Sequence, residues 1–338
     1  MFGVLPKFLT KCFMLYQFRT AKELLALCAK HKKPISEIAI LREIEFEHRE
    51  RAFILDQMRK VRQTMEQAIK TGLHSSEMAF MNLAGGDAAK IFRAKRKPKG
   101  KRLMSKLNLR AMAYATATGE TNAVMGRIAA FPTAGGAGVV PGVVFGFAHE
   151  YNLKSELVNR GLFTASAVGL IIAENATLSA AAAGCQAEVG AAMAMGAAAV
   201  TEMRGGTPEE CINASAIVLK SYLGVACDPL GGLVAVPCIK RNAIGCPSAF
   251  AASELSVAGV DSYIPFDEVV AAMWSIGQLM SPAIKETALG GLAITPTGLK
   301  VRKRLGLPDL KPTETMVQFG TQKKPVVGKP RRALKKLG

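Results

Sequence analysis

A long stretch of small residues, from position 111 to 204, constrains the fold of this chain more than any other feature. Nearly all of its residues are Ala, Gly, Met, Val or small polar residues. Small side chains let the axes of packed helices approach closely. Gly184, Gly190 and Gly196 recur every six residues, which is neither the alternation of a strand nor a heptad repeat. The stretch therefore predicts short helices that are buried together in the interior.

Amphipathic helices are indicated on both sides of this stretch. Between residues 54 and 69, apolar residues recur at intervals of three and four, which places them on one stripe of an α-helix. Gly72 follows where a C-terminal cap belongs. Downstream, Thr207, Pro208 and Glu210 form a capping box with proline at the first helical position. A helix is therefore expected to start at Pro208.

The fold class predicted from these patterns is mostly α. A further helix fits residues 267–280, and convincing strand alternation is found nowhere in the chain. The length of 338 residues is enough for one large domain with a full hydrophobic core. We expect a compact multi-helix domain with an Ala/Gly core, whose functional site is held by loops between the helices.

The charge of the chain is concentrated in two segments. The formal net charge is +18, which taken alone suggests a nucleic-acid or anionic-membrane partner. Residues 93–110 hold nine Lys or Arg and no acid, and residues 300–338 hold twelve against two, so the remainder sums to −1. We therefore expect three parts: an N-terminal extension (1–15), a folded domain (16–299) that is nearly neutral outside its basic segment 93–110, and a disordered basic tail (300–338).

Membrane insertion and export are both disfavoured. Residues 128–148 carry no charge over 21 positions, a length that could span a bilayer as a helix. The segment contains two prolines and five glycines, however, so a tightly packed soluble interior is the favoured interpretation. The N-terminal apolar runs are interrupted by Lys7 and Lys11, unlike a signal peptide. Seven cysteines without a dense framework indicate reduced thiols, so we expect a cytoplasmic protein.

A glycine-rich segment, residues 131–142, is the first candidate site. It contains Thr133-Ala134-Gly135-Gly136, where glycines free the backbone N–H groups to approach an anion at a helix start. It matches neither a dinucleotide-binding fingerprint nor a P-loop. A tight turn between two buried helices explains the same residues, and both interpretations stay open.

Three cysteines form the second candidate site. Cys185, Cys227 and Cys238 lie beside Gly, Pro and Asp in turn-like segments, whereas Cys28 and Cys211 fall within helical patterns and are expected to pack in the core. The gaps of 42 and 11 residues match no zinc or ferredoxin spacing. A metal shared by the three thiolates is thus one hypothesis, and separate structural thiols are the other.

Two acidic residues within the apolar stretches, Glu174 and Glu188, are candidates for buried acids. Partnered structural carboxylates would give the same pattern. All four histidines lie in the first half of the chain, and no known catalytic histidine signature is present.

Four segments carry a combined pattern: 122–138 (NAVMGRIAAFPTAGGAG), 175–190 (NATLSAAAAGCQAEVG), 227–242 and 286–298 (ETALGGLAITPTG). Together they resemble the α chain of iron–sulfur-dependent L-serine dehydratase. The resemblance runs from about residue 16 to residue 298, and its most specific blocks are GCQAEVG and CDP…GLV…VPC-x-KRN.

The resemblance implies an L-serine ammonia-lyase that converts L-serine to pyruvate and ammonia, a step of amino-acid catabolism that can feed gluconeogenesis. It implies a [4Fe–4S] cluster held by Cys185, Cys227 and Cys238, without pyridoxal phosphate. Three protein ligands leave one iron open, and an open iron can act as a Lewis acid on the substrate hydroxyl.

The resemblance also implies the substrate contacts and a partner. Thr133, Ala134, Gly135 and Gly136 would cradle the substrate carboxylate, and the side chains of Asn175 and Asn242 would line the site. The family divides catalysis between this part and a second part, so we expect a separate β chain that supplies the catalytic base. Neither a membrane nor a nucleic-acid partner is expected.

Departures from the family pattern leave the substrate open between L-serine and L-threonine or a related β-hydroxy amino acid. Gly136 replaces a serine, Ala183 stands where glycine is common, and Tyr263 and Lys285 occupy positions often held by arginine. Ala84 replaces a hydroxyl residue.

A competing interpretation is a non-catalytic protein that uses its basic segments to bind RNA or an anionic surface on a degenerate scaffold of this family. Only Phe92 lies near the first basic segment and only Phe319 within the tail, so stacking platforms for bases are nearly missing.

Overall fold

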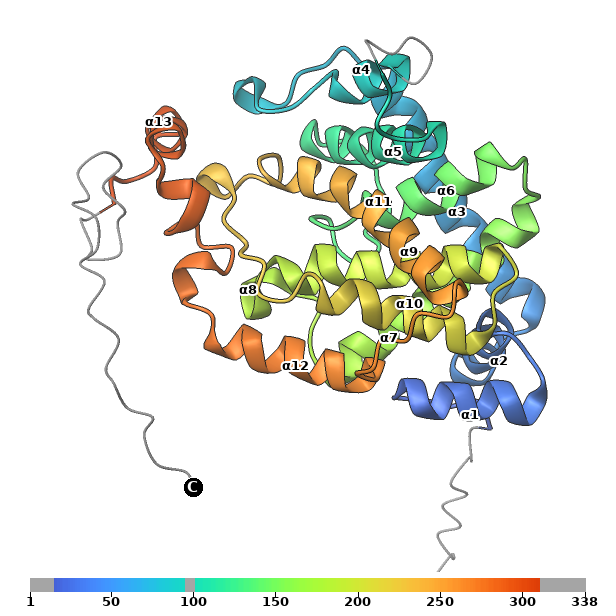
Figure 1. Ribbon diagram of the computed structural model, residues 1–338. Helices are drawn as coiled ribbons and strands as arrows, with labels where there is room; N and C mark the ends of the chain where they lie inside the picture. The colour runs from blue at the N-terminus through green and yellow to red at the C-terminus, as the bar shows by residue number, and fades with distance from the viewer. Residues whose placement is uncertain (1–14, 95–100, 311–338) are drawn as a thin grey trace, which may run out of the picture.

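The computed structural model describes residues 15–94 and 101–310 (Figure 1). This part of the chain contains thirteen α-helices and no strand, which confirms the mostly-α prediction; its one β-bridge joins Cys227 to Lys285. The helices are α1 (Ala21–His31), α2 (Ile35–Glu47), α3 (Arg51–His74), α4 (Asp87–Ala94), α5 (Lys106–Ala123), α6 (Val139–Glu150), α7 (Ser155–Asn175), α8 (Ala180–Ala183), α9 (Ala191–Met203), α10 (Pro208–Lys220), α11 (Cys238–Val257), α12 (Phe266–Leu279) and α13 (Pro296–Arg304).

Short helical turns connect several of these helices. A π-turn, η2 (Gln186–Gly190), lies between α8 and α9. The 3₁₀ turns are η1 (Phe80–Asn82), η3 (Leu230–Gly232), η4 (Pro282–Ile284) and η5 (Gly291–Ile294).

Helix α9 forms the centre of the molecule, as Figure 1 shows. Every one of its residues is buried, and it packs against α6, α7, α10 and α11. A Cβ atom on Gly196 would lie 3.4 Å from Val143 of α6, and one on Gly142 would lie 2.8 Å from the carbonyl oxygen of Ala111 of α5. The small-residue stretch is thus a set of closely packed buried helices, although α7, with 21 residues, is longer than predicted.

The N-terminal helices pack beside this centre, α2 against α7 and α3 against α5. Four of the five predicted stripe residues of α3 are buried: Ile54, Met58, Met65 and Ile69. Gly72 is not a cap, because α3 continues to His74. A Cβ atom at Gly72 would overlap the carbonyl oxygen of Ala117, so this glycine allows the close approach of α3 and α5.

The two predicted downstream helices are present. Thr207 caps α10 through the expected box: its hydroxyl accepts a hydrogen bond from the Glu210 N–H, while the Thr207 N–H donates to Glu210 Oε2 at 2.8 Å. The helix predicted at 267–280 is α12, Phe266–Leu279.

One described helix, α7, is long and apolar enough by composition to cross a membrane. Its apolar window is 61% buried within the fold, against α2 and α9, as in the core helix of a globular domain. The uncharged segment 128–148 that sequence singled out instead ends in α6, of only 12 residues.

The predicted boundary at residue 300 falls inside a helix. Helix α13 runs from Pro296 to Arg304 and projects at the upper left of Figure 1, with three of its four basic residues in the last turn. At the other end, the N–H of Tyr16 donates to Glu45 Oε2 at 3.0 Å. The predicted extension up to residue 14, positions 95–100 of the basic loop and the tail from 311 onward lie outside the described residues.

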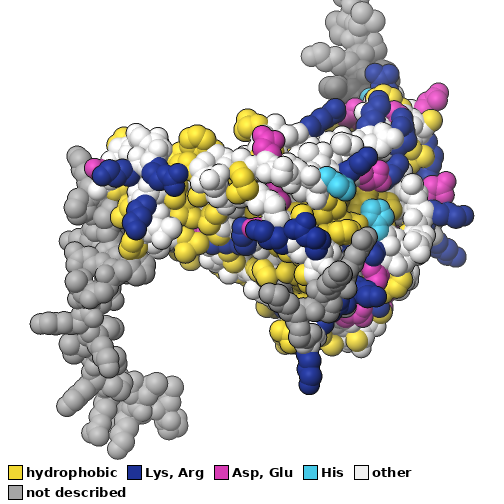
Figure 2. Space-filling model, turned by 90° about the horizontal axis from the view of Figure 1, so that it is seen from above, with side chains coloured by type: hydrophobic (Ala, Val, Ile, Leu, Met, Phe, Trp, Pro, Cys, Tyr) yellow, Lys and Arg dark blue, Asp and Glu magenta, His cyan; other side chains and the backbone are white. Residues whose placement is uncertain are grey.

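The basic side chains of the described residues are spread over the surface. Figure 2 shows Lys and Arg side chains in several separate groups on one face, with hydrophobic side chains between them. On this face, the charge therefore forms no continuous basic track.

Candidate functional site

The structure brings Cys185, Cys227 and Cys238 together from three different segments. Cys185 lies between α8 and η2, Cys227 lies in the loop after α10, and Cys238 is the first residue of α11. All three are buried, with at most 6% of each residue exposed. The Cys185 and Cys227 thiols are in hydrogen-bonding contact, and Cys238 is close enough for the charge on Cys185 to raise its pKa. Cys28 and Cys211 are buried within α1 and α10, as predicted for packing residues.

Backbone hydrogen bonds hold the first two cysteine segments in place. The Cys185 N–H donates to the Val225 carbonyl oxygen at 2.9 Å, two residues before Cys227. The Cys227 N–H donates to Ile284 at 2.8 Å, and its carbonyl oxygen accepts from the Glu286 N–H at 2.9 Å. Gly184 precedes Cys185 at φ +73, a left-handed conformation in which a Cβ would crowd the Val225 carbonyl. A glycine is therefore needed where the chain turns into the first cysteine.

The pKa values of the three thiols are shifted in different directions. The hydrogen bond from Cys227 lowers the pKa of Cys185, and the nearby Arg241 guanidinium lowers it further. The neighbouring Cys185 raises the pKa of Cys227, whereas burial raises the pKa of Cys238 to about 12. These contacts thus favour the thiolate form of Cys185, and a bound cation would replace the protons on the other two thiols.

The donor chemistry of this group fits an iron–sulfur cluster, because such clusters are held by cysteine thiolates. Within residues 15–94 and 101–310, no three His, Cys, Asp or Glu side chains converge closely enough to hold one metal ion. Three buried thiols beside an arginine provide negative ligands with a compensating charge.

A cavity of about 270 Å³ opens beside the first of these thiols, Cys185. Its walls are mostly apolar, and the residues around it include Cys185, Val189, Met193, Tyr222, Arg241 and Ile244. The site therefore offers space next to the first thiol as well as donors.

The predicted carboxylate cradle packs directly against the turn that follows Cys185. The Thr133 hydroxyl donates to Glu188 Oε1 at 2.7 Å and accepts a hydrogen bond from the Gly136 N–H at 3.2 Å. A Cβ on Gly135 would lie 2.5 Å from Glu188 Oε2, and one on Gly136 would lie 2.8 Å from the Glu188 carbonyl oxygen. Ala134 is exposed at the tip of this loop. The two glycines are thus required for the loop to reach η2.

The two acidic candidates have opposite environments. Glu188 is buried, and burial raises its pKa, while the hydrogen bond from Thr133 acts in the other direction and the charge of Glu286 adds to the rise. Glu174 is exposed on the last turn of α7, so the hypothesis of a buried acid is wrong for this residue.

Asn242 connects the loop to the helix that begins with Cys238. Its amide nitrogen donates to the carbonyl oxygens of Gly135 at 2.7 Å and Cys238 at 2.9 Å, and its Oδ1 accepts from the Gly138 N–H at 3.0 Å. The side chain is buried and its polar atoms are used by the backbone. Asn242 therefore fixes the position of the loop relative to the third thiol.

Asn175 is placed elsewhere. It is the last residue of α7, and its amide nitrogen donates to the carbonyl oxygens of Arg19 at 2.7 Å and Ile171 at 2.8 Å. These bonds tie the end of α7 to the segment before α1. They do not bring Asn175 to the thiols or to the Thr133 loop.

Sequence reasoning passed over two residues of the site. Arg241 and Asp228 form an ion pair at 2.9 Å between the second and third cysteine segments. A signal was present, since Asp228 directly follows Cys227 and Arg241 lies one helical turn after Cys238.

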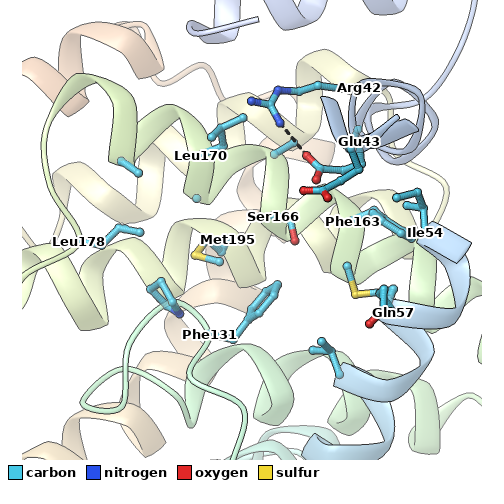
Figure 3. A pocket seen from close by; sticks show the side chains of 18 of the residues that line it. Arg42, Glu43, Ile54, Gln57, Phe131, Phe163, Ser166, Leu170, Leu178 and Met195 are labelled. Atoms are coloured by element: carbon cyan, nitrogen blue, oxygen red, sulfur yellow. Dashed lines mark hydrogen bonds and ion pairs between the residues drawn. The ribbon is translucent and has the colours of Figure 1, made fainter. Parts of the chain in front are cut away.

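A second cavity, of about 670 Å³, is separate from the thiols. Figure 3 shows Arg42 and Glu43 of α2 at one side of it, Ile54 and Gln57 of α3 at another, and Phe131 near Met195. Most of its walls are apolar and no cysteine lines it. Phe131 and Pro132, which come immediately before Thr133, line this cavity.

Comparisons with known proteins agree on one family. Residues 30–293 match the family model described as serine dehydratase alpha chain. Over 288 residues the chain is 47% identical to the probable L-serine dehydratase, alpha chain, of Bacillus subtilis, covering 85% of this chain and 95% of that protein. It is 38% identical over 284 residues to the L-serine dehydratase, alpha chain, of Peptoniphilus asaccharolyticus, covering 84% and 97%. The L-serine dehydratase of Helicobacter pylori is 38% identical over 292 residues, which cover 83% of this chain but 62% of that protein.

Proposed function

We propose, because this chain belongs to the serine dehydratase alpha chain family, that it converts L-serine to pyruvate and ammonia. The observation that carries this proposal is the meeting of three buried thiols from distant segments, beside a loop that already holds a carboxyl group. The same thiols are the residues that the family resemblance assigns to a cofactor.

The proposed cofactor is a [4Fe–4S] cluster held by Cys185, Cys227 and Cys238, with no pyridoxal phosphate. Such a cluster supplies an open iron that acts as a Lewis acid on the substrate hydroxyl. The burial of the thiols and the guanidinium beside Cys185 support this assignment. The cavity beside Cys185 supports it as well, because it leaves room for a substrate next to the ligands.

The loop Thr133–Gly136 is proposed to bind the carboxylate of the substrate. Its hydroxyl already faces a carboxyl oxygen of Glu188, and the absence of side chains at its two glycines lets that carboxylate lie close to the loop backbone. A substrate carboxylate on this loop would place a second acidic group beside Glu188. Like charges disfavour ionisation, so Glu188 is expected to keep a proton on its carboxyl in the complex.

The two asparagines take different parts in this proposal. Asn242 contributes by holding the loop at the start of α11, since its polar atoms are bonded to backbone. The sequence-based assignment of Asn175 to the substrate remains an untested prediction, and the bonds of Asn175 to Arg19 and Ile171 give it no support.

A separate β chain is proposed to complete the enzyme and to supply the catalytic base. The two relatives named alpha chain that are compared above are matched over 95% and 97% of their length, whereas the protein named L-serine dehydratase in Helicobacter pylori is matched over 62%. The remainder of the longer protein has no counterpart in the match. We further propose a cytoplasmic enzyme of amino-acid catabolism, whose pyruvate can enter gluconeogenesis.

The test is anaerobic reconstitution with iron and sulfide, with and without a candidate β chain, followed by an assay of pyruvate from L-serine and from L-threonine. The protein should turn brown and bind about four irons per chain, as a [4Fe–4S] cluster requires. Replacing Cys185, Cys227 or Cys238 by Ala should abolish the colour. The matched controls Cys28→Ala and Cys211→Ala should keep it.

Two outcomes would overturn this proposal. Retention of the cluster by all five cysteine variants would show that the ligands are other residues. A colourless protein that binds RNA in a salt-dependent way, and loses that binding when residues 300–338 are deleted, would favour the non-catalytic interpretation.

A further inference from the structure

Arg241 contacts the segments of two cysteines from the helix of the third. It lies one turn into α11, three residues after Cys238. Its Nη1 donates to the Ala226 carbonyl oxygen at 2.6 Å and its Nη2 donates to Asp228 Oδ1 at 2.9 Å, on the two sides of Cys227. The guanidinium also lies within hydrogen-bonding reach of the Cys185 thiol. One side chain therefore connects all three cysteine segments.

The carboxylate of Asp228, which pairs with Arg241, is itself held in a fixed position. It is 5% exposed, and its second oxygen, Oδ2, accepts a hydrogen bond from the Leu292 N–H at 2.7 Å. Gly291 packs so tightly against this carboxylate, at φ +57, that a Cβ would overlap it. Both carboxylate oxygens are thus engaged, which fixes the orientation of the planar guanidinium.

The neighbouring cation has a different position. Lys240 Nζ pairs with Asp87 Oδ2 at 2.9 Å, and its side chain is 55% exposed. The Arg241 side chain is 25% exposed and faces the thiols. Lys240 and Arg241 are adjacent in one helix and have the same charge, but the Lys240 charge lies at the surface and the Arg241 charge lies beside the cysteines.

We propose that Arg241 is a positioning residue that sets the spacing of the three cysteine ligands and stabilises the more reduced state of the cluster they hold. The inference rests on the proposed function. A fixed positive charge beside a cluster favours the state with one more electron, because that state is more negative. Through its bonds to Ala226 and Asp228, the same side chain keeps the Cys227 segment beside Cys185.

The experiment measures the midpoint potential of the reconstituted full-length chain by a redox titration followed by electron paramagnetic resonance. Arg241→Met keeps much of the side-chain volume and removes the charge. It should shift the ratio of reduced to oxidised cluster toward the oxidised form by about tenfold, which is about 59 mV for one electron. Lys240→Met removes a charge from the same turn at the surface and should shift the ratio much less.

A second variant predicts a shift of opposite sign. Asp228→Asn removes the negative partner and leaves the Arg241 charge uncompensated, so the ratio should move toward the reduced form. A purely structural role would lower the iron content and the thermal stability of both variants without shifting their potentials in opposite directions. Arg241→Lys keeps the charge but loses the two guanidinium donors, so it should bind less iron, with a nearly unchanged midpoint potential.

The outcomes separate this inference from the proposed function. If the unaltered chain binds no cluster, the proposed function fails and the inference with it. If the unaltered chain binds a cluster but Arg241→Met and Asp228→Asn leave the potential unchanged, or move it in one direction, only the role of Arg241 is overturned. If Arg241→Met binds no cluster, the test rests on Asp228→Asn. A midpoint potential of that variant that does not rise would then overturn the role of Arg241.

Discussion

Thr133 donates a hydrogen bond to Glu188 at 2.7 Å, across 55 residues of sequence. This bond joins the loop proposed to bind the substrate carboxylate to the turn that follows Cys185. A change on either residue is therefore expected to affect substrate binding without removing the thiols.

The Thr133 hydroxyl is expected to contribute to substrate affinity. Thr133→Val keeps the shape of the side chain but removes the hydroxyl that holds the loop on Glu188, so KM for L-serine should rise about tenfold, which corresponds to about 1.4 kcal/mol of binding free energy. Steady-state kinetics with the iron content measured in parallel would check this. Thr133→Ser, which keeps the hydroxyl, should remain close to the unaltered protein, and an unchanged KM in the valine variant would contradict the assignment.

The burial of Glu188 makes stability depend on pH. Its pKa is raised in the folded state by burial, so the unfolded chain releases this proton first as pH rises. The loss of folding free energy that results is absent when the pH lies below the pKa of Glu188 in the unfolded chain. It grows until the pH passes the pKa of Glu188 in the folded chain. Glu188→Gln keeps an oxygen for Thr133 and removes this cost, so its stability relative to the unaltered chain should be greater at pH 7 than at pH 4.

Denaturant unfolding of the metal-free protein at the two pH values measures this difference. Glu286, which raises the pKa of Glu188, and the three nearby thiols are present in both proteins and largely cancel. A Glu188→Gln variant whose relative stability did not change with pH would show that folding does not raise the pKa of Glu188.

Gly72 is expected to be essential for the packing of α3 on α5. Gly72→Ala places a methyl group against the Ala117 carbonyl oxygen and should destabilise the protein by about 1–3 kcal/mol, a typical cost of overpacking. Gly196→Ala is the matched control within a buried helix, because its Cβ would meet Val143 at an ordinary 3.4 Å. The helix propensity gained is the same in both. Equal thermal stability of the two variants would contradict the close approach.

Asn242 is expected to hold the loop through its two donated hydrogen bonds. Asn242→Asp replaces the donors by a carboxylate that faces the carbonyl oxygens of Gly135 and Cys238. Each buried group left without its partner costs about 1–3 kcal/mol, so the metal-free chain should lose stability. Chemical unfolding would measure the loss. A variant as stable as the original would mean that the loop is held by other contacts.

The sequence predicted helices well where the pattern depends only on residues that are near each other in the chain. The capping box at Thr207 and the apolar stripe of α3 depend on residues within a few turns of each other, and both are present. Gly72 was misread because a cap and a close helix contact require the same residue, and only the position of Ala117 distinguishes them.

The site was predictable in part. Turn-like surroundings separated Cys185, Cys227 and Cys238 from the core cysteines, but the cluster and the activity came from a family resemblance. Glu174 and Glu188 look alike in sequence, since both lie within apolar runs, and their burial is decided by which helices pack over them. Arg241 could not be distinguished from Lys240 without the fold, because the direction of each side chain depends on its partner, Asp228 or Asp87.

The hydrogen bonds of Cys227 to Ile284 and Glu286 have a consequence for biosynthesis. A nascent chain cannot complete the site until the segment around residue 290 has left the ribosome, because Asp228 is also fixed by Leu292. Any group bound by the three thiols is therefore inserted after translation of nearly the whole domain, and a truncation before residue 282 would yield a chain that folds its central helices yet stays unloaded.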